Sequence, residues 1–258
     1  MLAGLAEAGI DLTSADLVVG TSAGSVVGTQ ILCGPALEEL YAKQLEDATG
    51  EIAAKMSVGA MARFVMYAMW PGGEQSGRAR LGRAASRART VSESERRAVI
   101  GGRLPSPEWP DRKLRITAVD AETGELRVFD RDSGVTLLDA VAASCAVPLV
   151  WPPITIGGRR YIDGGARSVA NADLATGCDR VVVLAPLTVA LRRSSRIEKQ
   201  LASLGAGVRS VVVSPDAQAR RAIGGNSLDP AHRAASARAG RAQAASAVDS
   251  VKAVWETA

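Results

Sequence analysis

The stretch "DLVVGTSAGSVVG", residues 16–28, decides the fold of this chain. The apolar run at 17–19 suits a buried parallel strand, and residues 22–33 are typical of a helix packed on a sheet. Between them lies a Gly-x-Ser-x-Gly turn at 20–24. A strand, this turn and a helix form the setting of a nucleophile elbow, which holds a serine on a sharp bend. The stretch therefore makes Ser22 a candidate nucleophile.

Small residues around Ser22 have a physical reason. A side chain at Gly20 or Gly24 is expected to crowd the turn, and Gly24 and Gly28 should let the helix approach the sheet. The helix directs its positive end toward Ser22, and the amide of Ala23 is a candidate donor to a developing oxyanion. The motif by itself is weak, so a glycine-rich bend without chemistry is the alternative.

The rest of the chain alternates strands with helices. We predict helices at 2–8, 36–48, 51–69, 136–146, 194–205 and 231–256, hairpins at 114–130 and 154–162, and strands at 180–187 and 209–215. The strand runs are apolar rather than alternating. They predict an α/β fold of three layers, with a mostly parallel sheet and helices on both faces.

One domain accounts for all 258 residues. Residues 71–112 differ in composition, with many arginines, glycines and prolines. We predict that they form a variable basic insertion or lid-like region. Ser92 and Glu95 have capping-box spacing, which predicts a short helix inside it.

Composition excludes several classes of protein. The chain is 47% hydrophobic but only 3% aromatic, which predicts an aliphatic core. A net charge of +4 is too small to indicate nucleic-acid binding. Three irregularly spaced cysteines, one histidine and scattered carboxylates indicate neither a disulfide framework nor a metal site, and we expect no cofactor. We find no signal-peptide pattern, and we expect a cytoplasmic location.

A nucleophilic serine needs a base. His232 follows Asp-Pro at the start of an arginine-rich helix, which is a typical solvated position. Asp163, in "YIDGG", comes directly off a short strand, and Gly164 and Gly165 permit close approach of another backbone. Asp163 is the better candidate, with an ordinary Asp-Gly hairpin turn as the alternative.

The Gly-Thr-Ser-Ala-Gly turn and the downstream Asp-Gly-Gly together resemble the patatin-like phospholipases, acyl hydrolases with a serine–aspartate dyad. Residues 142–175 and 177–186 resemble the family's block around the aspartate and the strand that follows it. The resemblance implies a lipid or other acyl-ester substrate. Ser22 would attack the ester carbonyl, and Asp163 would accept its proton directly and then activate water. Supporting positions in the motifs and the oxyanion hole would be Gly20, Thr21, Ala23, Gly24, Gly164 and Gly165.

The start of the chain departs from the family pattern. Patatin-like proteins normally open with a strand and a glycine-rich loop that supplies the main oxyanion donors, whereas residues 1–21 hold no glycine run. We therefore expect the strand at 17–19 to lack a neighbour and the oxyanion hole to lack donors, which would lower stability and activity. Because the remaining pattern is intact, we also expect a misassigned start codon, which in-frame translation upstream of Met1 would test.

Three other interpretations stay open on the sequence alone. The chain could be a non-catalytic or truncated relative. It could be an α/β-hydrolase esterase using Ser22, Asp163 and His232, although such a fold places several strands before its elbow. A dinucleotide-binding turn is disfavoured, because Ser22 and Ser25 stand where that motif needs glycine.

Membrane contact is a further possibility, although the apolar segment at 56–70 is too short to span a bilayer. The Met and aromatic side chains at 61–70 suit a lipid-facing entrance, but such a stripe is more often core. The arginines at 78–89 suit anionic head groups, but a solvated helix face is more common. We expect at most transient membrane contact and no nucleic-acid partner. The residues concerned are Met61, Phe64, Met66, Tyr67, Met69, Trp70, Arg78, Arg80, Arg83, Arg87 and Arg89.

Overall fold

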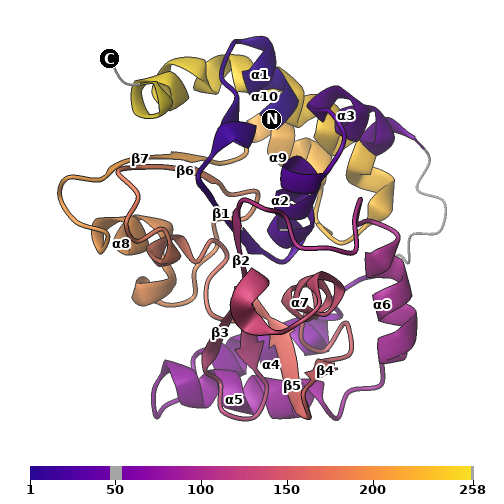
Figure 1. Cartoon of the computed structure of the whole chain (residues 1–258). Helices are drawn as coiled ribbons and strands as arrows, with labels where there is room; N and C mark the ends of the chain where they lie inside the picture. Colours follow the sequence, from indigo (N-terminus) through magenta and orange to yellow (C-terminus); the bar gives the residue numbers. More distant parts are fainter. Residues whose placement is uncertain (47–53, 257–258) are drawn as a thin grey trace.

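Two small sheets organise the computed structural model, which describes residues 1–46 and 54–256 (Figure 1). The first sheet has the strand order β1-β2-β5-β4, with β3 on β2, and the second pairs β6 with β7. β1 (Leu17–Thr21) runs parallel to β2 (Lys113–Asp120), and β6 (Arg180–Leu184) runs parallel to β7 (Arg209–Val213). The strands expected to form the parallel core are thereby confirmed.

Both predicted hairpins are also confirmed. β3 (Leu126–Phe129) returns antiparallel to β2, and β4 (Ile154–Ile156) pairs antiparallel with β5 (Arg159–Asp163). β5 then joins the other edge of β2 in antiparallel register. Thr21 lies opposite Thr117, and Asp163 lies opposite Ala118. The ends of β1 and β5 therefore meet on one edge of β2, opposite the neighbouring residues Thr117 and Ala118, whereas β3 occupies the other edge.

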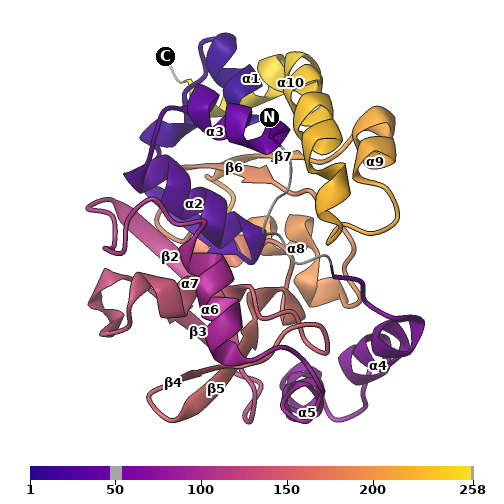
Figure 2. The same ribbon diagram turned by 90° about the vertical axis from the view of Figure 1, so that its right-hand side faces the viewer.

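Helices cover both faces of the first sheet (Figure 2). One face carries α2 (Ala23–Cys33), α6 (Glu93–Gly101) and α7 (Leu137–Ser144). The other face carries α5 (Glu74–Ala85), with α4 (Val58–Ala68) beside it.

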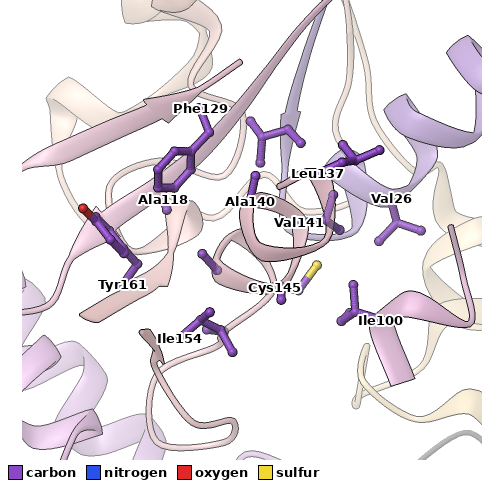
Figure 3. Close-up of a cluster of buried hydrophobic side chains, with 14 of the residues drawn as sticks. Val26, Ile100, Ala118, Phe129, Leu137, Ala140, Val141, Cys145, Ile154 and Tyr161 are labelled. Carbon is purple, nitrogen blue, oxygen red and sulfur yellow. The ribbon is translucent and has the colours of Figure 1, made fainter. Parts of the chain in front are cut away.

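The core under α2, α6 and α7 is mainly aliphatic, as the composition predicts (Figure 3). Small alanines from β2 and α7 alternate with larger side chains such as Ile100, Leu137 and Ile154. Phe129 and Tyr161 add an edge-to-face ring pair, with centroids 5.3 Å apart. Burial of this apolar surface fixes α7 over the β2–β5 pair.

The second sheet is covered in the same manner. α1 (Leu2–Glu7) and α10 (Arg233–Trp255) pack on one face, and α8 (Ile197–Ala202) packs on the other. α3 (Leu37–Leu45) and α9 (Ala217–Ile223) contact α10. The predicted three-layer α/β fold is confirmed.

Two local predictions are wrong at least in part, and one helix was not predicted. Helix α4 begins only at Val58, because Ser57 caps it by accepting a hydrogen bond from the amide of Ala60 at 3.1 Å, and residues 54–57 are irregular. In the stripe at 61–70 the three methionines are exposed and are not core, whereas Phe64 and Tyr67 are partly buried and pack against the core under α5. Helix α9 was not predicted, and the Asp216 carboxylate caps it. Residues 47–48 and 51–53 of the predicted helices lie outside the described residues.

The segment at 71–112 contributes two helices that rest on the sheet. Leu81 and Ala85 of α5 are buried against β2 and β5, and Ile100 of α6 is fully buried under α7. The predicted capping box of Ser92 and Glu95 is present. The lid-like interpretation of this segment stays a prediction.

Gly82 permits the close approach of α5 to the sheet, and its substitution tests that packing. A Cβ at Gly82 would lie 2.2 Å from the carbonyl oxygen of Ala121. We expect Gly82→Ala to lower the free energy of unfolding by about 1–3 kcal/mol, because backbone must move. Gly59→Ala, on α4 with no atom within 4 Å of the new Cβ, should instead raise it by about 0.5–1 kcal/mol. Urea unfolding followed by circular dichroism measures both, and equal effects would contradict the close packing.

Candidate active site

Ser22 occupies a strained turn between β1 and α2. Its backbone has φ 53° and ψ −125°, a conformation that residues other than glycine rarely adopt. The Ser22 amide donates to the Ser144 hydroxyl at 2.9 Å, and the Ser22 carbonyl accepts from the amide and hydroxyl of Ser25 at 2.8 and 2.7 Å. These bonds fix the turn from both sides. The predicted order of strand, sharp turn and helix is confirmed.

The glycines around Ser22 do not all serve the same purpose. A Cβ at Gly20 would lie 2.6 Å from the Cα of Ser25, so the expected crowding is confirmed there. A Cβ at Gly24 would meet nothing within 4 Å, so the prediction for Gly24 is wrong. At Gly28 a Cβ would lie 3.0 Å from Val18, which confirms that α2 packs tightly on the sheet at this position.

Asp163 ends β5 and points into the same site. It is only 4% exposed, its side chain is hydrogen-bonded to Ser22, and its Oδ1 accepts from the amide of Gly165 at 2.7 Å. A 3-10 turn at Gly164–Ala166 follows, so Asp163 is not part of a hairpin turn. A Cβ at Gly164 would lie 2.2 Å from the Thr117 hydroxyl, which confirms the expected close approach. The structure thus brings together the two residues that the sequence singled out.

Burial changes the acidity of this carboxyl group. Desolvation raises the pKa of Asp163 to about 6. The hydrogen bonds from Ser22 and Gly165 and the positive charge of Arg96 act in the opposite direction, because each favours the carboxylate. A carboxylate with a pKa near 6 can accept a proton far more readily than one near 4 and is still largely ionised at neutral pH.

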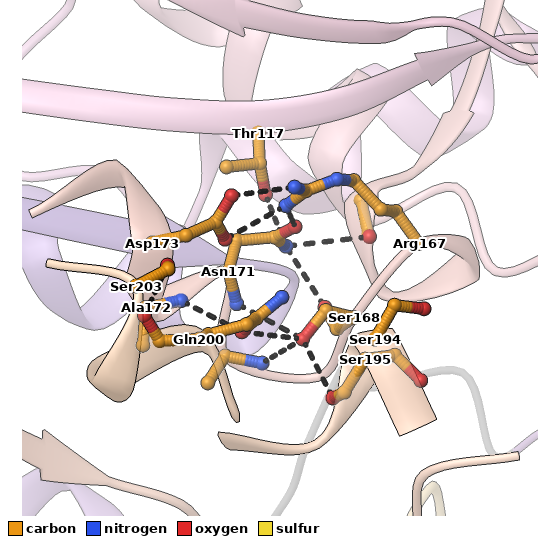
Figure 4. Close-up of polar contacts among 12 residues, drawn as sticks. Thr117, Arg167, Ser168, Asn171, Ala172, Asp173, Ser194, Ser195, Gln200 and Ser203 are labelled. Carbon is orange, nitrogen blue, oxygen red and sulfur yellow. Dashed lines mark hydrogen bonds and ion pairs between the residues drawn. The ribbon is translucent and has the colours of Figure 1, made fainter. Parts of the chain in front are cut away.

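A buried polar network is centred on Asn171 (Figure 4). Asn171 is fully buried, and its amide nitrogen donates to Thr21 at 3.0 Å and lies 3.4 Å from the Thr117 hydroxyl. The same nitrogen donates to the Ser168 carbonyl at 2.8 Å, and the Asn171 oxygen accepts from Arg167 at 2.7 Å. The network links β1 and β2 to the loop that follows Asp163. It therefore keeps the end of β1 and the end of β5 at a fixed distance from each other.

Ser22 and Asp163 line a large cavity of about 2420 Å³. Consecutive residues of β1 (17–19) and β6 (181–184) also line it. Side chains point to alternate faces along a strand, so a cavity against one face would contact every second residue. Contact with consecutive residues therefore indicates that the edges of these strands face the cavity. Within the described residues β1 pairs with β2 alone, so the expectation that the strand at 17–19 lacks a second neighbour is confirmed.

The remaining candidates have different positions. Ala23 is the first residue of α2, so its amide has no acceptor inside the helix and is placed to bind an anion beside Ser22. His232 lies at the start of α10 with its ring against Gly224. In residues 1–46 and 54–256 no hydrogen bond joins His232 to Ser22 or Asp163, so the structure does not support the triad.

Three contributing residues were not predicted from the sequence. Ser144 and Asn171 lie within the block that resembles the family's aspartate region, but more than a hundred residues separate them from Ser22. Arg96 lies in the arginine-rich segment, where no local pattern distinguishes it from its neighbours. Only their contacts in the folded chain reveal them.

The raised pKa of Asp163 predicts a pH-dependent cost to stability. Between pH 3.8 and about 6 the unfolded chain ionises this carboxyl before the folded chain does, so folded-state stability falls as pH rises through that window. Asp163→Asn removes this cost. The variant should gain about 1–3 kcal/mol relative to wild type at pH 8, and much less at pH 4. Urea unfolding at the two pH values measures this difference, and an equal effect at both would contradict the prediction.

Comparison with known proteins agrees with this geometry. The family model described as patatin-like phospholipase matches residues 2–176, well over half of the chain. The matched range contains both Ser22 and Asp163 and extends through the Asn171 network. A search of curated proteins finds no match. The chain belongs to the patatin-like phospholipase family, a family of lipid acyl hydrolases.

Proposed function

We propose that the protein is a serine acyl hydrolase that cleaves acyl esters of phospholipids or related lipids through an acyl-enzyme. The observation that supports this most is the hydrogen-bonded pair of Ser22 and Asp163, with Ser22 on a strained turn and Asp163 buried. A dyad needs its base within hydrogen-bond reach of the nucleophile, and this pair meets that requirement.

The reaction would proceed in two halves. In the first, the Ser22 hydroxyl oxygen bonds to the ester carbonyl carbon while its proton passes to the Asp163 carboxylate. The tetrahedral intermediate then collapses, and the alcohol leaves with the proton from Asp163. In the second half, Asp163 takes a proton from water, the hydroxide oxygen attacks the acyl carbon, and the acid leaves as the proton returns to Ser22.

Charge on the tetrahedral oxygen needs donors, and the N-terminus of α2 supplies them. Ala23 begins this helix, so its free amide and the positive end of the helix both lie beside Ser22. Loss of one oxyanion donor typically costs about 10²–10³ in rate.

Surface features near the cavity support transient contact between a cytoplasmic protein and a membrane. Five large apolar side chains line the cavity and are also exposed. One is Val27 on α2, and the other four, the apolar rim, are Met61, Val65, Leu187 and Val189. Arg192 joins the two segments by donating to the carbonyls of Ala68 and Trp70 at 2.6 and 3.0 Å. In the described residues no helix is both long and apolar enough to cross a bilayer. The rim would therefore rest on a lipid surface and admit one acyl chain.

Three of the arginines predicted to bind lipid head groups contact other parts of the protein instead. Arg78 and Arg83 donate to the carbonyls of Gly124 and Glu122 at 2.8 and 3.0 Å, and the Arg80 guanidinium lies 4.4 Å from the ring centre of Trp70. Arg63 and Arg193 are exposed beside the rim and better suited to anionic lipid.

The dyad predicts which substitutions stop the reaction. Ser22→Ala should abolish both labelling by a fluorophosphonate and hydrolysis of a p-nitrophenyl ester. Asp163→Asn should lower the rate by at least about a hundredfold, because the proton acceptor is lost. His232→Ala is the matched control and should keep wild-type rates. Labelling of Ser22→Ala at the wild-type rate, or loss of activity in a folded His232→Ala variant, would overturn the proposal.

The rim predicts lipid binding that depends on both apolar and basic residues. Met61→Ser combined with Val189→Ser should reduce sedimentation with phosphatidylcholine/phosphatidylglycerol vesicles by about tenfold. Arg63→Ala combined with Arg193→Ala should weaken binding at low salt, whereas Arg238→Ala, an exposed arginine on α10, should not. Failure of the wild type to sediment, or equal sedimentation of the double serine variant, would contradict the membrane contact.

A further inference from the structure

Two arginines, Arg78 on α5 and Arg192 on the loop between β6 and α8, line the cavity that holds Ser22 and Asp163. Basic side chains outnumber acidic ones among the described residues that line this cavity. A cleft in which one sign of charge prevails attracts ligands of the opposite sign, provided that its own ion pairs do not cancel that charge. The partners of these two arginines therefore decide whether the cavity can bind an anion.

Backbone carbonyls hold both guanidiniums in place without neutralising them. Arg192 donates to the carbonyls of Ala68 and Trp70 at 2.6 and 3.0 Å, and the Nε atom of Arg78 donates to the carbonyl of Gly124 at 2.8 Å. In the described part of the chain no hydrogen bond occupies Nη1 of Arg192 or either Nη atom of Arg78. Each guanidinium is thus fixed and still has donors for a ligand.

One carboxylate, that of Glu74, lies between the two segments that carry these arginines. Its Oε2 atom is 3.8 Å from Nη1 of Arg78, too far for a hydrogen bond, and its Oε1 atom accepts from the hydroxyl of Ser194, two residues after Arg192. Among residues 1–46 and 54–256 neither arginine has another ion-pair partner. One carboxylate cannot neutralise two guanidiniums, so the pair keeps a net positive charge.

The loop with Arg192 rests on the loop that follows Asp163 (Figure 4). The Ser168 hydroxyl lies 3.3 Å from the Ser195 carbonyl, and the Ser195 hydroxyl donates to the Arg192 carbonyl at 2.9 Å. These contacts join Arg192 to the segment that carries the base of the proposed dyad.

Arg78 is linked to the same segment from the other side. Ala166, three residues after Asp163, packs against the buried cluster that contains Leu81. Leu81 follows Arg78 by three residues on α5, so the two side chains lie on one face of that helix. Both arginines are therefore held close to the loop that begins at Asp163.

We propose that Arg78 and Arg192 form a subsite for the phosphate group of a phospholipid that has entered the cavity, beside the ester that Ser22 would attack. The inference rests on the proposed function and deepens it. A phosphate accepts several N–H bonds at once, and guanidinium groups match its geometry. A neutral glyceride or a simple ester has no group that would pair with these donors, so the subsite favours phospholipids over neutral esters. Arg192 lies outside the residues that match the family model, so the subsite is not taken from the family.

The first test measures binding and needs no activity. The probes are a glycerol phosphate with two ether-linked hexyl chains and the matching neutral dihexyl glycerol, both below their micelle concentrations. By calorimetry the wild type should bind the phosphate probe at least about tenfold more tightly than the neutral one. Arg78→Gln and Arg192→Gln should each remove most of this preference, and if one variant fails to fold, the other still tests the subsite.

Arg83→Gln is the matched control. Arg83 also lies on α5 and donates to a carbonyl of the β2–β3 turn, that of Glu122 at 3.0 Å, but it lines a different pocket. This variant should keep the wild-type preference. Equal affinity of the wild type for both probes, or an equal loss in Arg83→Gln, would overturn the proposal. Inorganic phosphate that binds as tightly as the phosphate probe would also overturn it, because the site would then take free phosphate rather than a lipid.

The second test follows hydrolysis of dibutyryl phosphatidylcholine and of p-nitrophenyl butyrate, both as monomers. Arg78→Gln and Arg192→Gln should lower the ratio of kcat/KM for the phospholipid to kcat/KM for the simple ester by about tenfold, mainly through KM. An equal loss with both esters would indicate a structural role and overturn the proposal. If the phosphate probe binds as expected but neither ester is hydrolysed, the phosphate subsite stands and the hydrolase function fails.

Discussion

The strained backbone of Ser22 is the constraint on which the site depends. A residue other than glycine in this conformation costs on the order of 1–3 kcal/mol and persists only where its surroundings impose it. Here β1 is held by β2 on one side, Ser144 accepts the Ser22 amide, and Ser25 binds the Ser22 carbonyl. The same arrangement begins α2 at Ala23. This strained turn therefore places the Ser22 hydroxyl beside the positive end of α2.

The sheet register decides which carboxyl meets that hydroxyl. β1 and β5 both pair with β2 and end at neighbouring levels, so Ser22 and Asp163 leave the sheet close together. The Asn171 network fixes the loop beyond Asp163 against Thr21. Because both faces are covered by helices, Asp163 is removed from water and its pKa rises to about 6. Packing of the layers thus raises the pKa of Asp163, which makes its carboxylate a better proton acceptor.

Elements that are far apart in the sequence line the cavity beside Ser22 and Asp163. The edges of β1 and β6 face it, α6 contributes Arg96, and α4 contributes part of the apolar rim. Within the described residues β1 has no second strand beside it, so its free edge directs backbone donors and acceptors into the cavity.

Most of the strands and helices, and the pair Ser22 and Asp163, follow from local patterns in the sequence. The apolar run before Gly-Thr-Ser-Ala-Gly, the two hairpins and the Asp-Gly-Gly after β5 all carry local signals, because strand burial and turn geometry constrain neighbouring residues. Contacts between distant segments show that Gly24 faces open space, that the methionines at 61–69 are exposed, and that Ser144 and Asn171 hold the Ser22 turn. Such contacts cannot be predicted from local periodicity, because a serine or an asparagine at the same position could equally well lie on a solvated surface.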